Sequence, residues 1–219
     1  MDRRFSNCRW AVAAACLSLS LLACTGCTPL VGLISILNGA HTVPAEFELP
    51  EDQRIAVVCV SQSGSFGPST VASMIANRVT MLLNENLGQV RLIEQQAIDD
   101  WRDHNGWDAI NYRELGRGVD ADIVVAIDLE SFSLHEGQTL LRGEASAGAT
   151  VYDMTTGGKI VKQWQPKSVR YPKTTGYYAG EMSEVEFRRA FVDVIARQIA
   201  RRFYRYEIVE DVAIDRVPQ

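Results

Sequence analysis

The chain has 219 residues and carries 27 Asp and Glu against 22 Lys and Arg, which gives a formal net charge of −5 at pH 7. This length is enough for one globular domain with a sizeable core. The acidic balance disfavours binding of nucleic acid or of an anionic membrane through the overall field of the protein. We therefore expect no nucleic-acid partner.

The N-terminus has the pattern of a secretory signal. Arg3, Arg4 and Arg9 precede the apolar run 10–23. Basic residues hold the start of such a segment on the cytoplasmic face while the apolar part enters the bilayer. The run has 14 residues, fewer than the roughly 20 that cross a hydrocarbon core. We predict that residues 1–23 are a cleaved lipoprotein signal peptide, and that the protein is in the cell envelope, facing the periplasm or the exterior.

A cysteine follows small residues at the end of this run. The sequence LLAC, ending at Cys24, resembles a lipobox, in which the cysteine thiol becomes acylated. The sequence TGC, ending at Cys27, is a second register and stays an alternative. An uncleaved anchor over 10–37 is the competing interpretation, but Gly26 and Pro29 disfavour one continuous helix there. We expect attachment to the membrane through a lipid on Cys24.

The sequence beyond the signal divides into three parts. Residues 24–53 hold the acylated terminus, a short apolar run at 30–37 and a linker with several Pro and Gly residues. Residues 54–204 are predicted to form a single domain, and 205–219 a C-terminal tail. Without residues 1–23, which carry three Arg and one Asp, the net charge becomes −7.

Apolar periodicity within 54–204 predicts an α/β (α+β mixed) fold with a mixed sheet of about five strands. The order is a βαβα start with parallel first strands, then a β-meander and a long C-terminal helix. Ser183 and Glu186 have the spacing of a capping box at the start of that last helix. The expected strands are 55–60, 90–94, 123–130, 140–153 and 159–169, and the expected helices are 70–86, 95–103, 110–119 and 183–203; the tail is expected either to add an edge strand at 208–209 or to fray.

Two phrases carry a resemblance to known proteins. Residues 118–125, GVDADIVV, place a small residue and Asp before an apolar strand, and residues 151–160, VYDMTTGGKI, form a strand, Asp, Thr-Gly, strand hairpin. Both resemble phrases of periplasmic α/β lipoprotein domains. Such domains occur in the curli-secretion lipoprotein, the penicillin-binding-protein activator lipoprotein and the N-terminal domain of the Tol-Pal translocation protein. The resemblance implies an assembly or interaction module without a catalytic centre.

The loop 61–70 is the candidate ligand site. In α/β sheets ligands bind beyond the carboxyl ends of strands, and the loop follows the first strand. Backbone amides and hydroxyls there could hold an anion at the start of the next helix, and the candidates are Ser63, Gly64, Ser65, Ser69 and Thr70. The Gly-Lys-Ser/Thr ending of a phosphate loop is missing, so a simple connection is the alternative. An envelope enzyme or small-ligand-binding protein using this loop is our second hypothesis.

Other polar residues form no catalytic or metal-binding set at the level of sequence. Cys59 stands inside an apolar strand, Asp128 and Glu130 alternate on one side of another strand, and the acids of 99–108 lack a histidine at ligand spacing. We expect a core thiol, exposed strand carboxylates and a solvated acidic helix face. No catalytic residue, metal or cofactor is predicted.

The connection 170–181 is the candidate contact surface. Tyr171, Tyr177 and Tyr178 lie there beside Arg170 and Lys173, and this composition is typical of protein-contact sites. The alternative is that the tyrosines cover the end of the sheet. The function that the sequence favours is a membrane-tethered, non-catalytic binding or assembly module with a protein partner in the envelope.

Overall fold

The computed structural model describes residues 42–61, 70–105, 111–137, 139–178 and 180–208. Among these residues no helix is both long enough and apolar enough to cross a membrane. The observed order agrees with the predicted βαβα start, meander and long last helix. The elements are β1 (Thr42–Val43), β2 (Arg54–Ser61), α3 (Thr70–Leu87), β3 (Arg91–Leu92), α4 (Gln95–Asn105), α5 (Tyr112–Gly118), β4 (Ile123–Glu136), β5 (Leu140–Asp153), β6 (Lys159–Tyr171), β7 (Tyr177–Tyr178), α6 (Glu184–Ala200) and β8 (Tyr206–Glu207).

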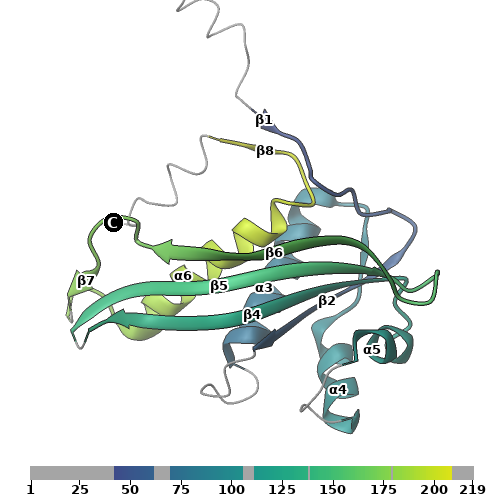
Figure 1. Ribbon diagram of the computed structural model, residues 1–219, viewed down its shortest axis with the longest axis horizontal. Helices are drawn as coiled ribbons and strands as arrows, with labels where there is room; N and C mark the ends of the chain where they lie inside the picture. Colours follow the sequence, from purple (N-terminus) through teal and green to yellow (C-terminus); the bar gives the residue numbers. More distant parts are fainter. Residues whose placement is uncertain (1–41, 62–69, 106–110, 138, 179, 209–219) are drawn as a thin grey trace, which may run out of the picture. The chain divides into compact units, whose positions relative to one another are not determined.

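A mixed sheet organises these elements (Figure 1). Its strand order is β3-β2-β4-β5-β6, and β7 pairs with β5 beyond the end of β6. β2 runs parallel to β3 and β4, whereas β4, β5 and β6 form an antiparallel meander. The predicted mixed α/β class is confirmed. The sheet has six strands rather than five because β7 extends the meander at its tip.

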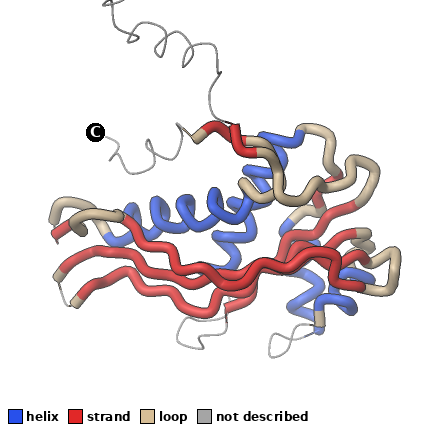
Figure 2. Tube along the Cα trace, turned by 45° about the horizontal axis from the view of Figure 1, so that its top comes forward, coloured by secondary structure: helices blue, strands red, loops and turns tan. Residues whose placement is uncertain are grey.

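Helices cover both faces of the parallel part of the sheet. Along β2, Ile55 and Val57 belong to the larger core with α3 and α6, while Ala56 and Val58 belong to a second core with α4 and α5. A strand buried on both faces has a continuous apolar sequence, which is the pattern that β2 shows. Figure 2 shows α6 lying along the long strands.

The meander extends further than the sequence analysis predicted. Strand β4 was expected to end at residue 130 but continues to Glu136. Its second half alternates, with Phe132 and Leu134 buried toward α6 and Ser131 and Ser133 exposed. A register shift between Leu129 and Ser131 restores the inward phase after Glu130, and such a bulge is invisible to a strict two-residue period.

The helix α6 packs closely on β4 and β5, and Phe191 makes contacts with both strands. Phe191 stacks on Phe132 with ring centroids 5.3 Å apart. A Cβ at Gly143 would lie 2.5 Å from Cδ1 of Phe191, so only glycine leaves space for this ring. Ser183 and Glu186 form the predicted capping box, with the Glu186 N–H donating to Ser183 Oγ at 3.2 Å. The helix therefore begins where the sequence predicted.

Both phrases that resemble lipoprotein domains have structural roles here. Asp122 accepts a hydrogen bond from the backbone N–H of Arg54 at 2.8 Å, and Asp120 pairs with the Arg54 guanidinium, which ties the starts of β2 and β4 together. Asp153 accepts hydrogen bonds from the hydroxyl and N–H of Thr155 in the β5–β6 turn. These bonds lower the pKa of Asp153. The two phrases therefore mark strand starts and a turn.

The two ends of the described domain meet in a small two-stranded sheet. β1 pairs antiparallel with β8, so Val43 lies opposite Tyr206. The tail was expected either to add an edge strand at 208–209 or to fray; β8 comprises Tyr206 and Glu207, and position 209 lies outside the described residues. Just after β1, the carboxylate of Glu46 accepts a hydrogen bond from the Trp164 indole at 2.6 Å. This contact holds the segment between β1 and β2 against β6.

Candidate functional site

Several predicted site residues lie outside the described part of the chain. These are the lipidation candidates Cys24 and Cys27 and the loop residues Ser63, Gly64, Ser65 and Ser69. Thr70 is the first residue of α3, which begins where a Ser/Thr cap was expected. Acylation of the cysteines and ligand binding by the loop therefore stay predictions.

The three candidate contact tyrosines separate into different environments. Tyr171 is only 4% exposed and stacks on Phe187 with centroids 5.9 Å apart. Tyr177 is half-buried and meets the edge of the same ring, whereas Tyr178 is 60% exposed. Tyr171 and Tyr177 thus cover the end of the sheet, as the alternative interpretation had it. Tyr178 alone of the three presents its ring to solvent, because β7 places alternate residues on opposite faces.

The other polar candidates have local structural partners. Asp128 is half-buried, not fully exposed as expected, and accepts a hydrogen bond from the Tyr112 hydroxyl at 2.8 Å. Glu130 accepts one from Ser146 at 2.9 Å. Within the described residues no group of three His, Cys, Asp or Glu side chains is placed to hold a metal ion. Burial raises the pKa of the Cys59 thiol, and Asp128 adds to this shift, so the nucleophilic thiolate is disfavoured.

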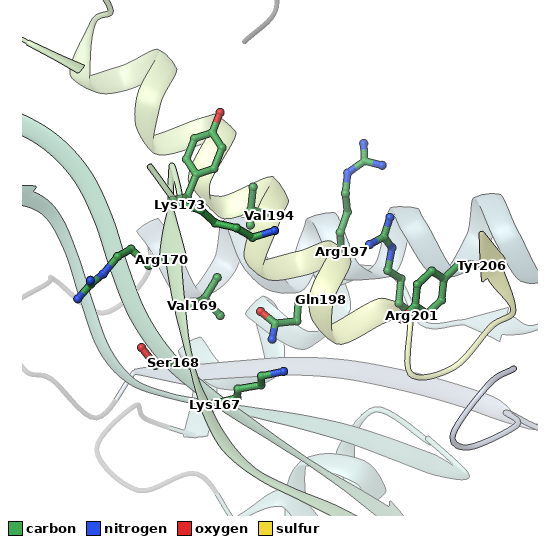
Figure 3. A pocket seen from close by; sticks show the side chains of 11 residues that line it. Lys167, Ser168, Val169, Arg170, Lys173, Val194, Arg197, Gln198, Arg201 and Tyr206 are labelled. Atoms are coloured by element: carbon green, nitrogen blue, oxygen red, sulfur yellow. The ribbon is translucent and has the colours of Figure 1, made fainter. Parts of the chain in front are cut away.

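A groove of about 420 Å³ lies between β6 and α6 (Figure 3). Five consecutive residues of β6, Lys167 to Tyr171, line it. Side chains of neighbouring strand residues point to opposite faces, so a groove that touches all five runs along the edge of the strand. From the other side the groove is lined by Val194, Arg197, Gln198 and Arg201 of α6, with Lys173 and Tyr206 at its ends.

The β6 edge in this groove carries no further strand among the described residues. The opposite side of β6 pairs with β5 over its length, with register shifts opposite Ala147 to Ala149. In a paired strand about half of the backbone N–H and C=O groups point away from the partner. The backbone groups of β6 that are not bonded to β5 therefore point toward the groove. Pro166 lies within β6, which is a position that proline tolerates in edge strands.

Positive charge dominates the groove. Five of its lining residues are cationic, namely Lys167, Arg170, Lys173, Arg197 and Arg201, and no acidic side chain of the described chain lines it. Lys167 and Lys173 point toward α6, whereas Arg170 lies on the other side of β6 (Figure 3). Among the described residues, Arg170 pairs with Glu144 at 3.2 Å and Arg197 with Asp193 at 2.6 Å, and both acids lie outside the groove lining. The groove is thus an electropositive strip on an acidic protein.

Apolar and aromatic surface forms the remainder of the groove. Val169 is buried beneath it, and Val194 contributes from α6. The guanidinium of Arg201 lies over the Tyr206 ring at 4.6 Å from its centroid, which fixes a buried cation by a contact worth about 1 kcal/mol or more. This combination of backbone edge, cations and apolar side chains is suited to an extended anionic segment rather than to a small molecule.

Sequence reasoning did not find this groove. Its two walls, 167–173 and 194–201, are separated by about twenty residues of chain that includes β7. One signal was present: Gln198 interrupts the apolar stripe of α6, and Arg197 and Arg201 lie one turn apart beside it. A polar interruption on a helix face indicates that this part of the face borders water.

Comparisons with known proteins find distant structural similarities and no sequence relatives. No family model matches the sequence, and no curated protein matches it either. Similar solved structures include lipoprotein GNA1162 from Neisseria meningitidis, with 18% identity over 67% of this chain and 97% of that chain at a TM-score of 0.44. They also include the PelC dodecamer from Paraburkholderia phytofirmans, with 12% identity over 76% and 98% at 0.44.

The LpoB C-terminal domain from Salmonella enterica is also similar, with 16% identity over 63% of this chain and 93% of that domain at a TM-score of 0.37. Bacterial lipoproteins are therefore among the structures that this chain resembles, as the two sequence phrases predicted. Similarity at this level carries no statement about activity or partners.

Proposed function

We propose that this chain is a lipid-anchored, non-catalytic binding module of the bacterial cell envelope, and that the groove between β6 and α6 receives an extended acidic segment of a protein partner. The observation that carries the proposal is the course of the groove. It follows the backbone edge of β6 for five residues and gathers five cations around that edge.

The β6 edge can bind a peptide by strand addition. An extended peptide that lies beside an edge strand forms main-chain hydrogen bonds, which supply affinity, while side-chain pockets supply specificity. The stretch from Lys167 to Tyr171 would pair with about five residues of a partner. Tyr178 lies on β7, which continues the same edge along β5, and offers an exposed aromatic contact next to the groove.

The cations determine which segment can pair with the β6 edge. If two copies paired their β6 edges, the cations of the two grooves would be brought close together, which is unfavourable. Pro166 and the irregular register nearby also discourage pairing between identical edges. An acidic segment would instead neutralise the groove. The chain carries a net charge of −5, so attraction to such a segment is local and sensitive to salt.

The membrane tether is the second part of the proposal. The basic start, short apolar run and LLAC sequence support cleavage after residue 23 and acylation of Cys24. In cells grown with labelled palmitate, the protein should take up label, and Cys24→Ser should abolish both labelling and cleavage. Labelling that persists in Cys24→Ser but is lost in Cys27→Ser would move the site to Cys27. A chain that keeps residues 1–23 would show an uncleaved anchor instead.

Peptide titration tests the groove. The full chain, purified in a non-ionic detergent, is titrated with a fluorescent peptide of five Val-Glu repeats, and with its Val-Lys counterpart as a matched control. We expect binding of the Val-Glu peptide alone, weakened by salt. Lys167→Glu should reduce the affinity about fivefold or more, whereas Arg91→Glu, the same charge change on the far edge strand β3, should leave it unchanged.

Two further probes separate strand addition from simple charge attraction. N-methylation of alternate residues removes hydrogen-bond donors from one edge of a peptide, so one methylation register should abolish binding and the other should not. Heparin carries negative charge without a peptide backbone. Equal effects of both methylation registers, or heparin binding as tight as that of the Val-Glu peptide, would refute the strand-addition proposal.

A further inference from the structure

We infer that the seam between α3 and α6 is a second contact surface, which receives an amphipathic helix of a protein partner with an acidic residue beside its apolar face. The seam is a depression of about 340 Å³, and its lining includes Met74, Arg78 and Met81 of α3 and Arg189, Val192 and Asp193 of α6. None of these residues lines the groove between β6 and α6. The inference therefore goes beyond the function proposed for that groove and does not depend on it.

The lining of the seam is largely apolar. Val192 is buried, Met74 is half-buried, and Met81 is 53% exposed within the 18-residue helix α3. Met74 and Met81 lie about two turns apart, so they share one side of the helix. Methionine is flexible and polarisable, and it is common on surfaces that adapt to different helices. The seam therefore offers an adaptable apolar surface that the described chain leaves open to solvent.

Arg189 adds a positive charge at the seam. It is exposed, and it forms no ion pair with any side chain of the described chain. Hydrogen bonds from Ser183, and to a smaller extent the charge of Arg189, lower the pKa of Glu186, but that carboxylate is already held in the capping box. The other cation of the seam, Arg78, pairs with Asp193 at 2.5 Å. A carboxylate of the partner would therefore complement Arg189.

A helix is the occupant that fits this surface. The backbone groups of α3 and α6 are bonded within the helices, so an extended segment would find few main-chain partners in the seam. A helix satisfies its own backbone, and it binds a groove through apolar side chains spaced three, four and seven residues apart. The lining positions 74, 78 and 81 of α3, and 189, 192 and 193 of α6, have these spacings as well. Side chains of a third helix can therefore pack between those of α3 and α6.

A second copy of the chain matches the seam less well. If two seams faced each other, Arg78 and Arg189 of one copy would approach the same cations of the other. Asp193 is the only acidic side chain of the described chain in the lining, and Arg78 already pairs with it. Because like charges brought together in an interface are unfavourable, the charge of the seam favours an acidic partner over self-association.

Peptide titration tests the surface. The full chain in phosphatidylcholine nanodiscs is titrated with a fluorescent helical peptide that has leucines along one face and glutamates beside them, and empty nanodiscs give the background. A peptide of the same composition with its leucines spread around the helix is the matched control. We expect saturable binding of the first peptide, at least fivefold tighter than that of the control. Equal binding of the two peptides, or binding of neither, would overturn the inference.

Two substitutions assign this binding to the seam. Met81→Gln keeps a long side chain with good helix propensity, so the fold should be retained while the affinity falls about fivefold or more. Ile160→Gln, at a comparably exposed position of β6, should leave the affinity unchanged. Arg189→Glu should weaken binding of the glutamate peptide and allow binding of the same peptide with lysines in place of glutamates. That exchange shows that the variant is folded and that the contact is direct, whereas unchanged affinities in both variants contradict the inference.

Crosslinking in intact cells tests which occupant the seam has. A benzophenone amino acid replaces Asn77, an exposed residue of the lining. We expect a protein adduct that maps to an amphipathic helix with an acidic residue, and that disappears when Met81→Gln is added. The same label at Gln96, exposed on α4, is the control and should not give this adduct. Adducts only between two copies, or only with lipid, would overturn the inference.

The seam and the groove can fail independently. Lys167→Glu should leave binding of the helical peptide unchanged, and Arg189→Glu should leave binding of the Val-Glu peptide unchanged. If the chain binds the Val-Glu peptide but not the helical one, the groove function stands and the seam inference falls; the opposite result supports the seam and refutes the groove. Weakened binding of the helical peptide in Lys167→Glu would place that peptide in the groove and would contradict the seam inference.

Discussion

The sheet ends in two very different edges. β3 contributes only 2 residues to one edge, while β6 contributes 13 to the other. A two-residue edge offers few backbone groups, whereas a long one is a template for a further strand. Lysines, Pro166 and an irregular register make the long edge unsuitable for pairing with itself. A long edge strand therefore offers more backbone groups to a partner than a short one. Its side chains then determine which partner segment can pair with it.

The two edges also differ in what supports them. β6 rests on aromatic residues of α6 and of the C-terminal turn, with Trp164 against Phe203 and Tyr171 against Phe187. The β3 side is held by a smaller cluster in which Ile98 of α4 packs with residues of β2 and β4. Substitutions that destabilise the β6 side of the sheet and spare the β3 side, or the reverse, test whether the two sides are supported independently.

The largest expected effect comes from Phe191→Ala. Phe191 is fully buried and stacks with Phe132 and Tyr171, so its loss should reduce the free energy of unfolding by about 3–5 kcal/mol. Native-state hydrogen exchange should show lost protection in β6 before β3. Ile98→Ala is the matched control on the other side and should reverse this order. If protection falls equally on both sides in both variants, the two halves of the sheet do not open separately.

Alkaline pH should lower the stability of the fold through Cys59 on β2 and Tyr112 on α5. Burial raises the pKa of the Cys59 thiol above its ordinary value of 9.0, and Tyr112 shifts in the same direction through burial and Asp128. The thiol stays protonated in the fold while it ionises in the unfolded chain. The contribution of the protonated thiol to the free energy of unfolding is therefore complete below pH 9. Above pH 9 this contribution declines by about 1.4 kcal/mol per pH unit.

Urea unfolding between pH 8 and 10.5 measures this decline. The variant Cys59→Ala removes the thiol and should flatten the dependence, leaving the smaller part that comes from Tyr112. An unchanged slope in Cys59→Ala would mean that the thiol is not responsible.

A moderate effect is expected where α6 begins. Ser183 Oγ accepts the N–H of Glu186 in the capping box, and Ser183→Ala should lower stability by about 1 kcal/mol. Ser168→Ala, on the exposed side of β6, removes the same hydroxyl without a cap and should stay within about 0.5 kcal/mol. Thermal unfolding of both variants checks the difference. Equal losses would show that the cap contributes nothing beyond the hydroxyl.

The smallest effect on stability is expected for charge reversal on the two edges. Lys167 and Arg91 are both exposed, so Lys167→Glu and Arg91→Glu should each change the free energy of unfolding by no more than about 0.5 kcal/mol. Denaturant titration checks this, while the salt dependence of Val-Glu peptide binding should change for Lys167→Glu only. A large loss of stability in Lys167→Glu would mean that this lysine supports the fold and that its binding defect is indirect.

Local patterns in the sequence accounted for most of the fold. Continuous apolarity predicted β2, period-2 alternation predicted β5, and Ser183 with Glu186 predicted the start of α6. These features depend on neighbours within a few residues, which is why the sequence displays them. The second half of β4 was missed because the bulge at Glu130 shifts the phase of its alternation.

The site depended on contacts that no local pattern contains. Tyr171, Tyr177 and Tyr178 are near neighbours in sequence, yet Tyr171 packs on Phe187 and only Tyr178 reaches solvent. The exposure of an aromatic residue in a loop depends on which helix lies beneath it. Sequence composition drew attention to the segment 170–181 but could not tell which of its aromatic residues are exposed.

Local patterns were sufficient to predict the order and type of the elements, and the composition gives the acidic character of the chain. The acylated N-terminus, inferred in the same way, stays a prediction. Tertiary contacts alone make β6 the long edge strand of the described sheet and place Lys167 and Arg201 on one groove. The physical reason is that apolar periodicity reports which face of a strand is buried. The neighbours at its two edges are chosen by pairing between segments that are distant in the chain.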